Sequence, residues 1–303
     1  MRLMVADADC LDDKRMDAIA SGLSARVPSF SLNKTILSEE KITDILLRGA
    51  SAVVEHYGMD PSELDRLQDR GASFTEGEVA ARDIRRALPS AFVRRIARSR
   101  LSLGAGNHFI ELRRVDRILE ETLAGQLGLR VGQLAVLLHA GSAGVGVYAS
   151  NFYGPRPNAE PRVTAFCHFS RIVSGRLGLE IQFLWYRLRN PDSRTRTLFQ
   201  YDAESEAGRR YRMALGLASN FASANRTHLG HQVRLQLRES LGKPDLELRL
   251  ICCLPHISLR KEEHFGQPVW VHRHGAARAL PPQRLPDGHP FKETANWRWC
   301  AGP

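Results

Sequence analysis

The feature that most constrains the fold of this chain is a change in the spacing of its apolar residues near Gly106. Upstream of this point, apolar residues recur every three to four positions, as in helices, and downstream they form alternating or continuous runs typical of strands. The helical segments upstream are 12–27, 38–58 and 75–100, the last of them broken near Pro89. Helices followed by strands are typical of the α+β class rather than of a doubly wound parallel sheet.

Downstream of Gly106, short segments predict both strands and helices. Strands are predicted over 107–115, 132–139, 179–188, 231–240 and 245–254, and helices over 116–129 and 203–229. The segment 203–229 is the best helical pattern in the chain, because its apolar side chains fall on one face. No internal repeat and no linker is evident. We therefore predict one α+β domain over residues 1–303, with mixed or antiparallel sheets.

The chain carries a strong positive charge. Its 303 residues include 43 Lys and Arg against 33 Asp and Glu, which gives a formal net charge of +10. A basic protein attracts polyanions at long range, which favours a nucleic acid or a nucleotide as partner. The alternative is that the charge serves no specific acidic ligand.

Cysteine usage and the length of the apolar runs argue against several classes of protein. The five cysteines lack any C-x-x-C spacing, which argues against a zinc ribbon or a disulfide scaffold. The apolar runs are too short to cross a bilayer, and the first residues turn acidic without the apolar core of a signal peptide. We therefore expect no membrane partner and a cytoplasmic location.

Three histidines share a local context that is typical of a metal site. His108 follows the small residues of LSLGAGNHFIEL, His139 ends a predicted strand before AGSAGVG, and His256 follows the strand segment LRLICCLP. Such positions can direct imidazoles into a shared cleft, and neutral imidazoles bind transition metals. The alternative for each is an ordinary surface or core histidine. The glycine-rich AGSAGVG could bind a phosphate, although no P-loop motif is present.

Four blocks of sequence carry a resemblance to a known family. In chain order they are LSLGAGNHFIEL, VLLHAGSAGVG, NFASANR and PHISLRKEEHFGQPVWVHRHGAARA. Together they resemble the RtcB-type RNA ligases of tRNA splicing and RNA repair, with similarity from about Met1 to His289. The Gly-x-Gly-Asn-His-Phe-x-Glu block is highly specific to that family. The resemblance implies an α+β fold with a central mixed or antiparallel β core flanked by helices.

The resemblance also implies an activity. Members of this family join RNA ending in a 2′,3′-cyclic phosphate or 3′-phosphate to RNA beginning with a 5′-hydroxyl. They use GTP and manganese and pass through a histidine–GMP intermediate. The implied partners are RNA, as tRNA halves or broken RNA, together with GTP and an archease-like activator.

The resemblance assigns roles to five residues of this chain. His108, His139 and His256 match the metal-binding histidines, Asn107 matches the asparagine beside the nucleotide phosphates, and Glu111 matches a glutamate expected to contact guanine. It assigns no catalytic histidine, because the guanylylated histidine belongs to a His-Gly-Ala-Gly-Arg motif that has no match here. The arginines would bind the RNA backbone.

The chain also departs from the family pattern. We expect an incomplete RtcB-like domain that lacks the N-terminal Asp-x-Gly-Cys-Gly metal motif and the C-terminal guanylylation segment. Ala140 and Ala143 replace a serine and an arginine, and Ile257 replaces an asparagine. His272 and His274 are alternative nucleophiles, although neither lies in the expected motif. These departures predict impaired ligation by this chain alone; the alternative is an inactive relative that still binds RNA or nucleotide.

Overall fold

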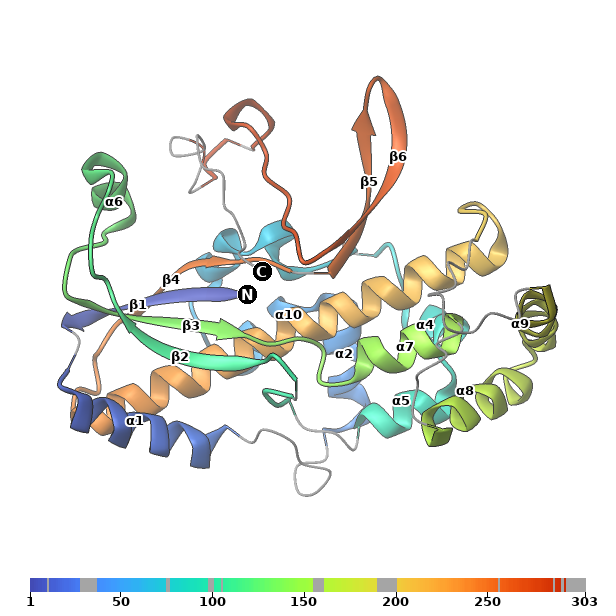
Figure 1. Cartoon of the computed structure of the whole chain (residues 1–303), viewed down its shortest axis with the longest axis horizontal. Coiled ribbons are helices and arrows are strands. Elements are labelled where there is room, and N and C mark those ends of the chain that lie inside the picture. The colour runs from blue at the N-terminus through green and yellow to red at the C-terminus, as the bar shows by residue number, and fades with distance from the viewer. Residues whose placement is uncertain are drawn as a thin grey trace.

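The computed structural model combines helices with antiparallel sheets (Figure 1), which confirms the predicted α+β class. The described residues are 1–9, 11–27, 37–74, 77–97, 101–104, 106–154, 161–189, 201–255, 257–285, 287–289 and 292. Among the described helices, none combines the length and the apolar content needed to cross a lipid bilayer.

The larger sheet has four strands in the order β2-β3-β1-β4, and every neighbouring pair is antiparallel. Its strands are β1 (Arg2–Asp9), β2 (Phe109–Arg114), β3 (Gln133–His139) and β4 (Leu248–Cys253). The apolar patterns predicted β2, β3 and β4 correctly. They missed β1, in which Met4, Val5 and Ala6 are all buried and no alternation is visible.

The second sheet is a two-stranded antiparallel hairpin that projects from the rest of the molecule (Figure 1). It consists of β5 (Ile257–His264) and β6 (Gln267–His274). Both residues of its turn, Phe265 and Gly266, have positive φ angles, 54° and 73°. Two successive positive φ angles are typical of the tight turns that join antiparallel strands.

The helix α10 (Glu206–Leu241) runs through the middle of the molecule (Figure 1). Its 36 residues span about 54 Å at the usual helical rise. The Ser205 hydroxyl caps its first turn, and Gly242 ends it in a left-handed conformation. Its helical neighbours are α1 (Asp13–Arg26), α2 (Glu39–Arg48), α3 (Ala50–His56), α4 (Ala81–Ala87) and α7 (Val145–Tyr153).

Two large apolar clusters pack along α10. One joins the sheet to α1, α3 and the C-terminal half of α10, and Met4, Val136 and Leu237 belong to it. The other joins the N-terminal half of α10 to a group of helices that includes α2 and α7. The remaining helices are α5 (Ser90–Ala97), α6 (Glu121–Leu127), α8 (Pro161–Val173), α9 (Leu177–Arg189), η1 (Pro61–Arg66), η2 (Gln68–Gly71) and η3 (Pro282–Arg284).

Two of the predicted strands are wrong. Residues 179–188 belong to α9, and residues 231–240 continue α10. In the second segment, the alternation of Val233, Leu235 and Leu237 is typical of a strand, but Val233 and Leu237 are one helical turn apart and both are fully buried. The helical spacing therefore determines the structure of this segment.

The predicted helix 38–58 divides into α2 and α3 at Gly49. The φ angle of this glycine is 60°, and a Cβ atom there would lie 2.2 Å from the carbonyl oxygen of Gly71. No other residue type fits at this position without moving the backbone of η2. The break therefore depends on a long-range contact that the local sequence does not reveal.

Candidate functional site

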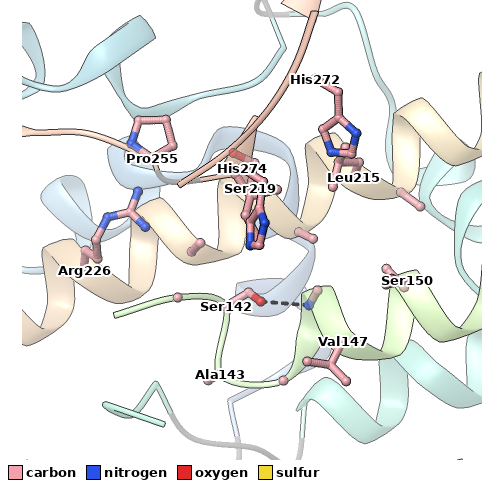
Figure 2. A pocket seen from close by; sticks show the side chains of 18 of the residues that line it. Ser142, Ala143, Val147, Ser150, Leu215, Ser219, Arg226, Pro255, His272 and His274 are labelled. Atoms are coloured by element: carbon pink, nitrogen blue, oxygen red, sulfur yellow. Dashed lines mark hydrogen bonds between the residues drawn. The ribbon is translucent and has the colours of Figure 1, made fainter. Parts of the chain in front are cut away.

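A cavity of about 400 Å³ lies between α7, α10 and the base of the β5–β6 hairpin (Figure 2). Its walls come from four distant parts of the chain: the start of β2, the loop after β3, the middle of α10 and the two strands of the hairpin. Among the described residues that line it, none is an aspartate or a glutamate. His108 and Arg226 are among the lining residues. The charge of the lining therefore favours an anionic ligand.

His108 and His139 lie next to each other beside this cavity. Their ring centroids are 5.6 Å apart with an interplanar angle of 35°. The strand register explains the placement, because Phe109 pairs with His139 across β2 and β3 and its ring stacks on that imidazole at 5.5 Å. Two of the three histidines predicted to converge are therefore adjacent.

The third predicted ligand, His256, lies outside the described residues. Within the part of the chain that the structure describes, no group of three or more His, Cys, Asp and Glu side chains is arranged to hold a metal ion. The convergence of all three histidines therefore stays a prediction, and it rests on the pair at the ends of β2 and β3.

The glycines before His108 have a local reason. Gly104 has a φ angle of 92°, and a Cβ atom on it would lie 2.6 Å from Nδ1 of His108. The imidazole of His108 thus occupies the space that a side chain at Gly104 would need. Gly106 also has a positive φ angle, 83°, but nothing lies within 4 Å of the position of its Cβ. Gly104 is required for packing, whereas Gly106 is required only for its backbone conformation.

Burial lowers the pKa of both imidazoles below its usual value, and the positive charge of Arg226 acts in the same direction. The pKa of His139 is lowered further by the neighbouring His108. In addition, Nδ1 of His108 is buried without a hydrogen-bond partner among the described residues. Both imidazoles are therefore neutral at pH 7, which is the form that binds a metal ion.

Arg226 is a site residue to which the sequence patterns assigned no role. It projects from α10 toward Pro255 (Figure 2), and only 2% of the residue is exposed. Its Nη1 donates to the carbonyl oxygen of Ala140 at 3.2 Å, and its Nε donates to Sγ of Cys253 at 3.4 Å. The signal was present in NFASANR, where polar residues occupy the buried face of a helix.

Asn225, the neighbour of Arg226, holds two loops of the site together. Its Nδ2 donates to the carbonyl oxygens of Ser102 and Gly141, both at 2.8 Å. Ser102 precedes the glycines before His108, and Gly141 belongs to the loop after β3. The amide of Asn225 therefore fixes the approach to His108 relative to the loop that follows His139.

The loop after β3 leads into α7 and lines the cavity. The Ser142 hydroxyl accepts a hydrogen bond from the backbone N–H of Gly146 at 2.8 Å (Figure 2). Gly144 has a φ angle of 95°, and Ala143, which is not a glycine, has one of 47°. Helix N-termini of this kind bind phosphates through backbone N–H groups and the helix dipole. This loop is the part of the cavity best suited to an anion.

Asn107 and Glu111 lie away from the cavity wall. Asn107 is exposed, and neither residue belongs to the cavity lining. The Glu111 carboxylate accepts a hydrogen bond from Nε of Arg113 at 2.9 Å. Because side chains alternate along a strand, Glu111 shares a face of β2 with Phe109, which stacks on His139. The nucleotide-binding roles of both residues stay predictions.

His272 and His274 line the cavity from the opposite side. They are two residues apart on β6, so their side chains leave the same face of the strand. Figure 2 shows both imidazoles directed toward α10, near Leu215 and Ser219. Burial, and then the charge of His274, lower the pKa of His272. The hairpin thus brings both alternative nucleophiles to the cavity that His108 lines.

Comparison with known proteins gives a consistent picture. A family model described as tRNA-splicing ligase RtcB matches residues 1–296. The tRNA-splicing ligase RtcB of Pyrococcus furiosus is 33% identical over 282 residues, which cover 88% of this chain and 25% of that protein. That of Thermococcus kodakarensis is 30% identical over 287 residues, 92% of this chain and 50% of that protein. The chain thus spans between a quarter and a half of these relatives.

Proposed function

Because the chain belongs to the RtcB family of tRNA-splicing ligases, we propose that it supplies the metal- and phosphate-binding part of an RNA-joining site. The proposed reaction joins RNA that ends in a 2′,3′-cyclic phosphate or a 3′-phosphate to RNA that begins with a 5′-hydroxyl. It would depend on GTP and manganese. The observation that supports this proposal best is the adjacent imidazole pair of His108 and His139, beside a cavity whose described lining residues include no aspartate or glutamate.

In this proposal the residues of the chain have distinct tasks. His108 and His139 would hold a manganese ion, which when bound neutralises negative charge on phosphate oxygens. Arg226 and the first turn of α7 would bind phosphate, because both line the cavity, one with a guanidinium and the other with the positive end of a helix dipole. His256 would add a third imidazole, and Asn107 and Glu111 would contact the nucleotide, as the resemblance implies.

RNA is the proposed polymeric partner, and an archease-like activator is a proposed protein partner. The excess of basic residues supports RNA, because phosphate contacts from Lys and Arg supply most of the affinity for nucleic acids. Binding of this kind weakens as salt concentration rises. We therefore expect the affinity for RNA to fall steeply between low and moderate salt.

Metal binding can be measured by titrating the protein with manganese chloride in a calorimeter. We expect weak binding, because two neutral imidazoles bring no negative charge to the ion. Replacing His139 by alanine should weaken the binding at least about tenfold, the loss of roughly 1.4 kcal/mol. The matched control is His264→Ala, which removes an exposed histidine of the hairpin outside the cavity lining. Equal effects of the two substitutions would contradict the proposed site.

The position of Ala143 favours a second candidate function, nucleotide or RNA binding without ligation. Ala143 lines the cavity at the position where the resemblance expects an arginine. An arginine there would add a bidentate donor for a phosphate. We expect Ala143→Arg to raise the affinity for GTP in the presence of manganese by about tenfold, with Val147→Arg on the same wall as a control for added charge.

A ligation assay separates the two functions. The protein is incubated with GTP, manganese and a pair of RNAs, one ending in a cyclic phosphate and the other beginning with a 5′-hydroxyl. A joined product or a covalent guanylate adduct supports the ligase. Metal and GTP binding without either product supports the second function. Absence of both GTP binding and RNA binding by the natural chain and by Ala143→Arg would contradict both functions.

A further inference from the structure

The helices α8 and α9 carry a large apolar surface that faces away from the rest of the molecule. Eight large apolar side chains on these two helices are between 50% and 68% exposed. They are Phe169, Ile172 and Val173 on α8, and Leu177, Ile181, Leu184, Trp185 and Leu188 on α9. The five on α9 recur at intervals of three and four residues, so they form one stripe along the helix. We call these eight side chains the α8–α9 surface.

The opposite sides of the same helices are buried and well connected. Leu179 and Phe183 of α9 are 7% and 3% exposed and belong to the apolar cluster along α10. Glu180 of α9 accepts a hydrogen bond from Nη1 of Arg171 at 2.7 Å. Nη2 of Arg171 in turn donates to the carbonyl oxygen of Asn151 in α7 at 2.5 Å. These contacts fix which side of α9 faces inward, so the apolar stripe on the other side is a defined feature of the fold.

A helix that is apolar on both sides is normally covered on both sides. Exposed apolar surfaces of several hundred square ångströms mark sites of interaction in soluble proteins. We propose that the α8–α9 surface is a homodimer interface, on which a second copy of this chain packs through the same surface. This inference goes beyond the proposed function and does not depend on it.

The area of the surface fits this occupant. Eight large side chains that each expose about 100 Å² would cover about 800 Å² on each copy, the size of a standard protein–protein interface. Because both copies would use the same residues, the contact closes as a twofold dimer and does not extend into a chain. In such a dimer, the apolar stripe of one copy would pack against the apolar stripe of the other.

Charge is also compatible with self-association. Glu180, the acidic residue of α9, is turned inward, where it pairs with Arg171 and His168. Arg189, at the end of the stripe, lies over the ring of Trp185, with its Cζ atom 5.0 Å from the ring centroid. The described charged side chains of α9 therefore lie away from the centre of the interface, where they would not bring like charges together.

The test is sedimentation velocity of the full chain over a range of concentrations. We expect a dimer at about 100 µM, above the micromolar end of the affinities found for interfaces of this size. Leu184→Glu places a charge in the middle of the stripe and should give a monomer at the same concentration. The matched control is Leu119→Glu, because Leu119 is 82% exposed and lies outside the α8–α9 surface. Circular dichroism spectra of both variants should match that of the natural chain.

Three outcomes would overturn the proposal. The natural chain could remain monomeric throughout, or both variants could dimerise equally, or larger open assemblies could form without a discrete dimer. A monomer that instead sediments with phosphatidylcholine–phosphatidylglycerol vesicles would assign the surface to lipid. Dimer formation that is lost in Leu184→Glu alone would support the proposal, whatever the result of the ligation assay.

Discussion

The sheet and the α8–α9 region lie at opposite ends of the molecule (Figure 1) and differ in how completely their apolar residues are covered. In the sheet, one face packs on α1, α3 and α10, and the other packs on α6. Of the fifteen large apolar side chains that are exposed among the described residues, eight belong to α8 and α9. The apolar residues of the sheet region are therefore mostly covered by other described elements, whereas the outer face of α8 and α9 is not.

Each region also contains a glutamate that is only 13% or 15% exposed and that bonds to two Arg or His side chains. In the sheet region Glu63 accepts hydrogen bonds from Arg234 and from Nη2 of Arg2, the latter at 2.6 Å. In the α8–α9 region Glu180 bonds to Arg171 at 2.7 Å and to Nδ1 of His168 at 2.6 Å. Each glutamate has one buried arginine as a partner, Arg2 or Arg171, and the second partners differ, because the Arg234 side chain is 13% exposed and the His168 side chain is 35% exposed.

The largest expected effect follows from this difference. Replacing Glu63 by glutamine would leave the Arg2 guanidinium buried without a counter-charge, a change that costs about 3–5 kcal/mol. Glu180→Gln should cost less, because it leaves one buried guanidinium without a counter-charge, that of Arg171, which keeps its hydrogen bonds to the carbonyl oxygens of Asn151 and Phe152. Urea unfolding of both variants measures the free energy of unfolding. Equal losses in the free energy of unfolding of the two variants would show that the two glutamates contribute equally to stability.

The second-largest expected effect is a loss of stability at low pH, and it arises from His228 in the sheet region. His228 of α10 bonds through Nδ1 to the Tyr57 hydroxyl at 2.7 Å, and burial, followed by the nearby His231 and His56, lowers its pKa to about 4. Above the pKa of an unfolded histidine, near 6.5, both states are neutral and the group adds nothing. As the pH falls through that value, only the unfolded chain gains a proton. The free energy of unfolding therefore falls by up to roughly 3 kcal/mol between pH 6.5 and 4.

Replacing His228 by phenylalanine tests this expectation. The variant loses the bond to Tyr57 and is less stable at pH 7.5, but its stability should fall less between pH 6.5 and 4 than that of the natural chain. The measurement is urea unfolding at several pH values. The matched control is His264→Phe, because His264 is exposed on the hairpin. Parallel pH profiles for the natural chain and the His228 variant would show that another group dominates the acid response.

The comparison also explains which parts of the fold could be predicted from the sequence. Strand β3 was predicted because its continuous apolar run is almost entirely buried, and β2 was predicted from its alternating residues, although its first four residues are all half-buried. Residues 179–188 were predicted wrongly as a strand because α9 is apolar on both sides, which hides the helical period and resembles a buried strand. The apolar residues on the outer side of α9, which led to the wrong prediction, are also the ones that form its exposed surface.

The candidate site shows a similar limit. His108 and His139 could be predicted as neighbours, because glycine-rich segments and strand ends mark both of them in the sequence. Arg226, His272 and His274 could not be placed with them, because their positions depend on how α10 and the hairpin pack against the loop after β3. The contacts of α10 with this loop join residues more than eighty positions apart, and no local pattern records them.

The smallest expected effect tests directly whether the outer face of α9 is uncovered in the monomer. Leu184 of α9 is 60% exposed, so Leu184→Ala should change the free energy of unfolding of the monomer by no more than about 0.5 kcal/mol. Leu237 of α10, which is fully buried, provides the matched control, and Leu237→Ala should cost about 2–5 kcal/mol. Unfolding is measured at protein concentrations below dimer formation. A loss of more than 1 kcal/mol for Leu184→Ala would mean that the outer face of α9 is covered within a single chain, because truncating an exposed side chain removes few packing contacts. The difference between the two regions would then disappear.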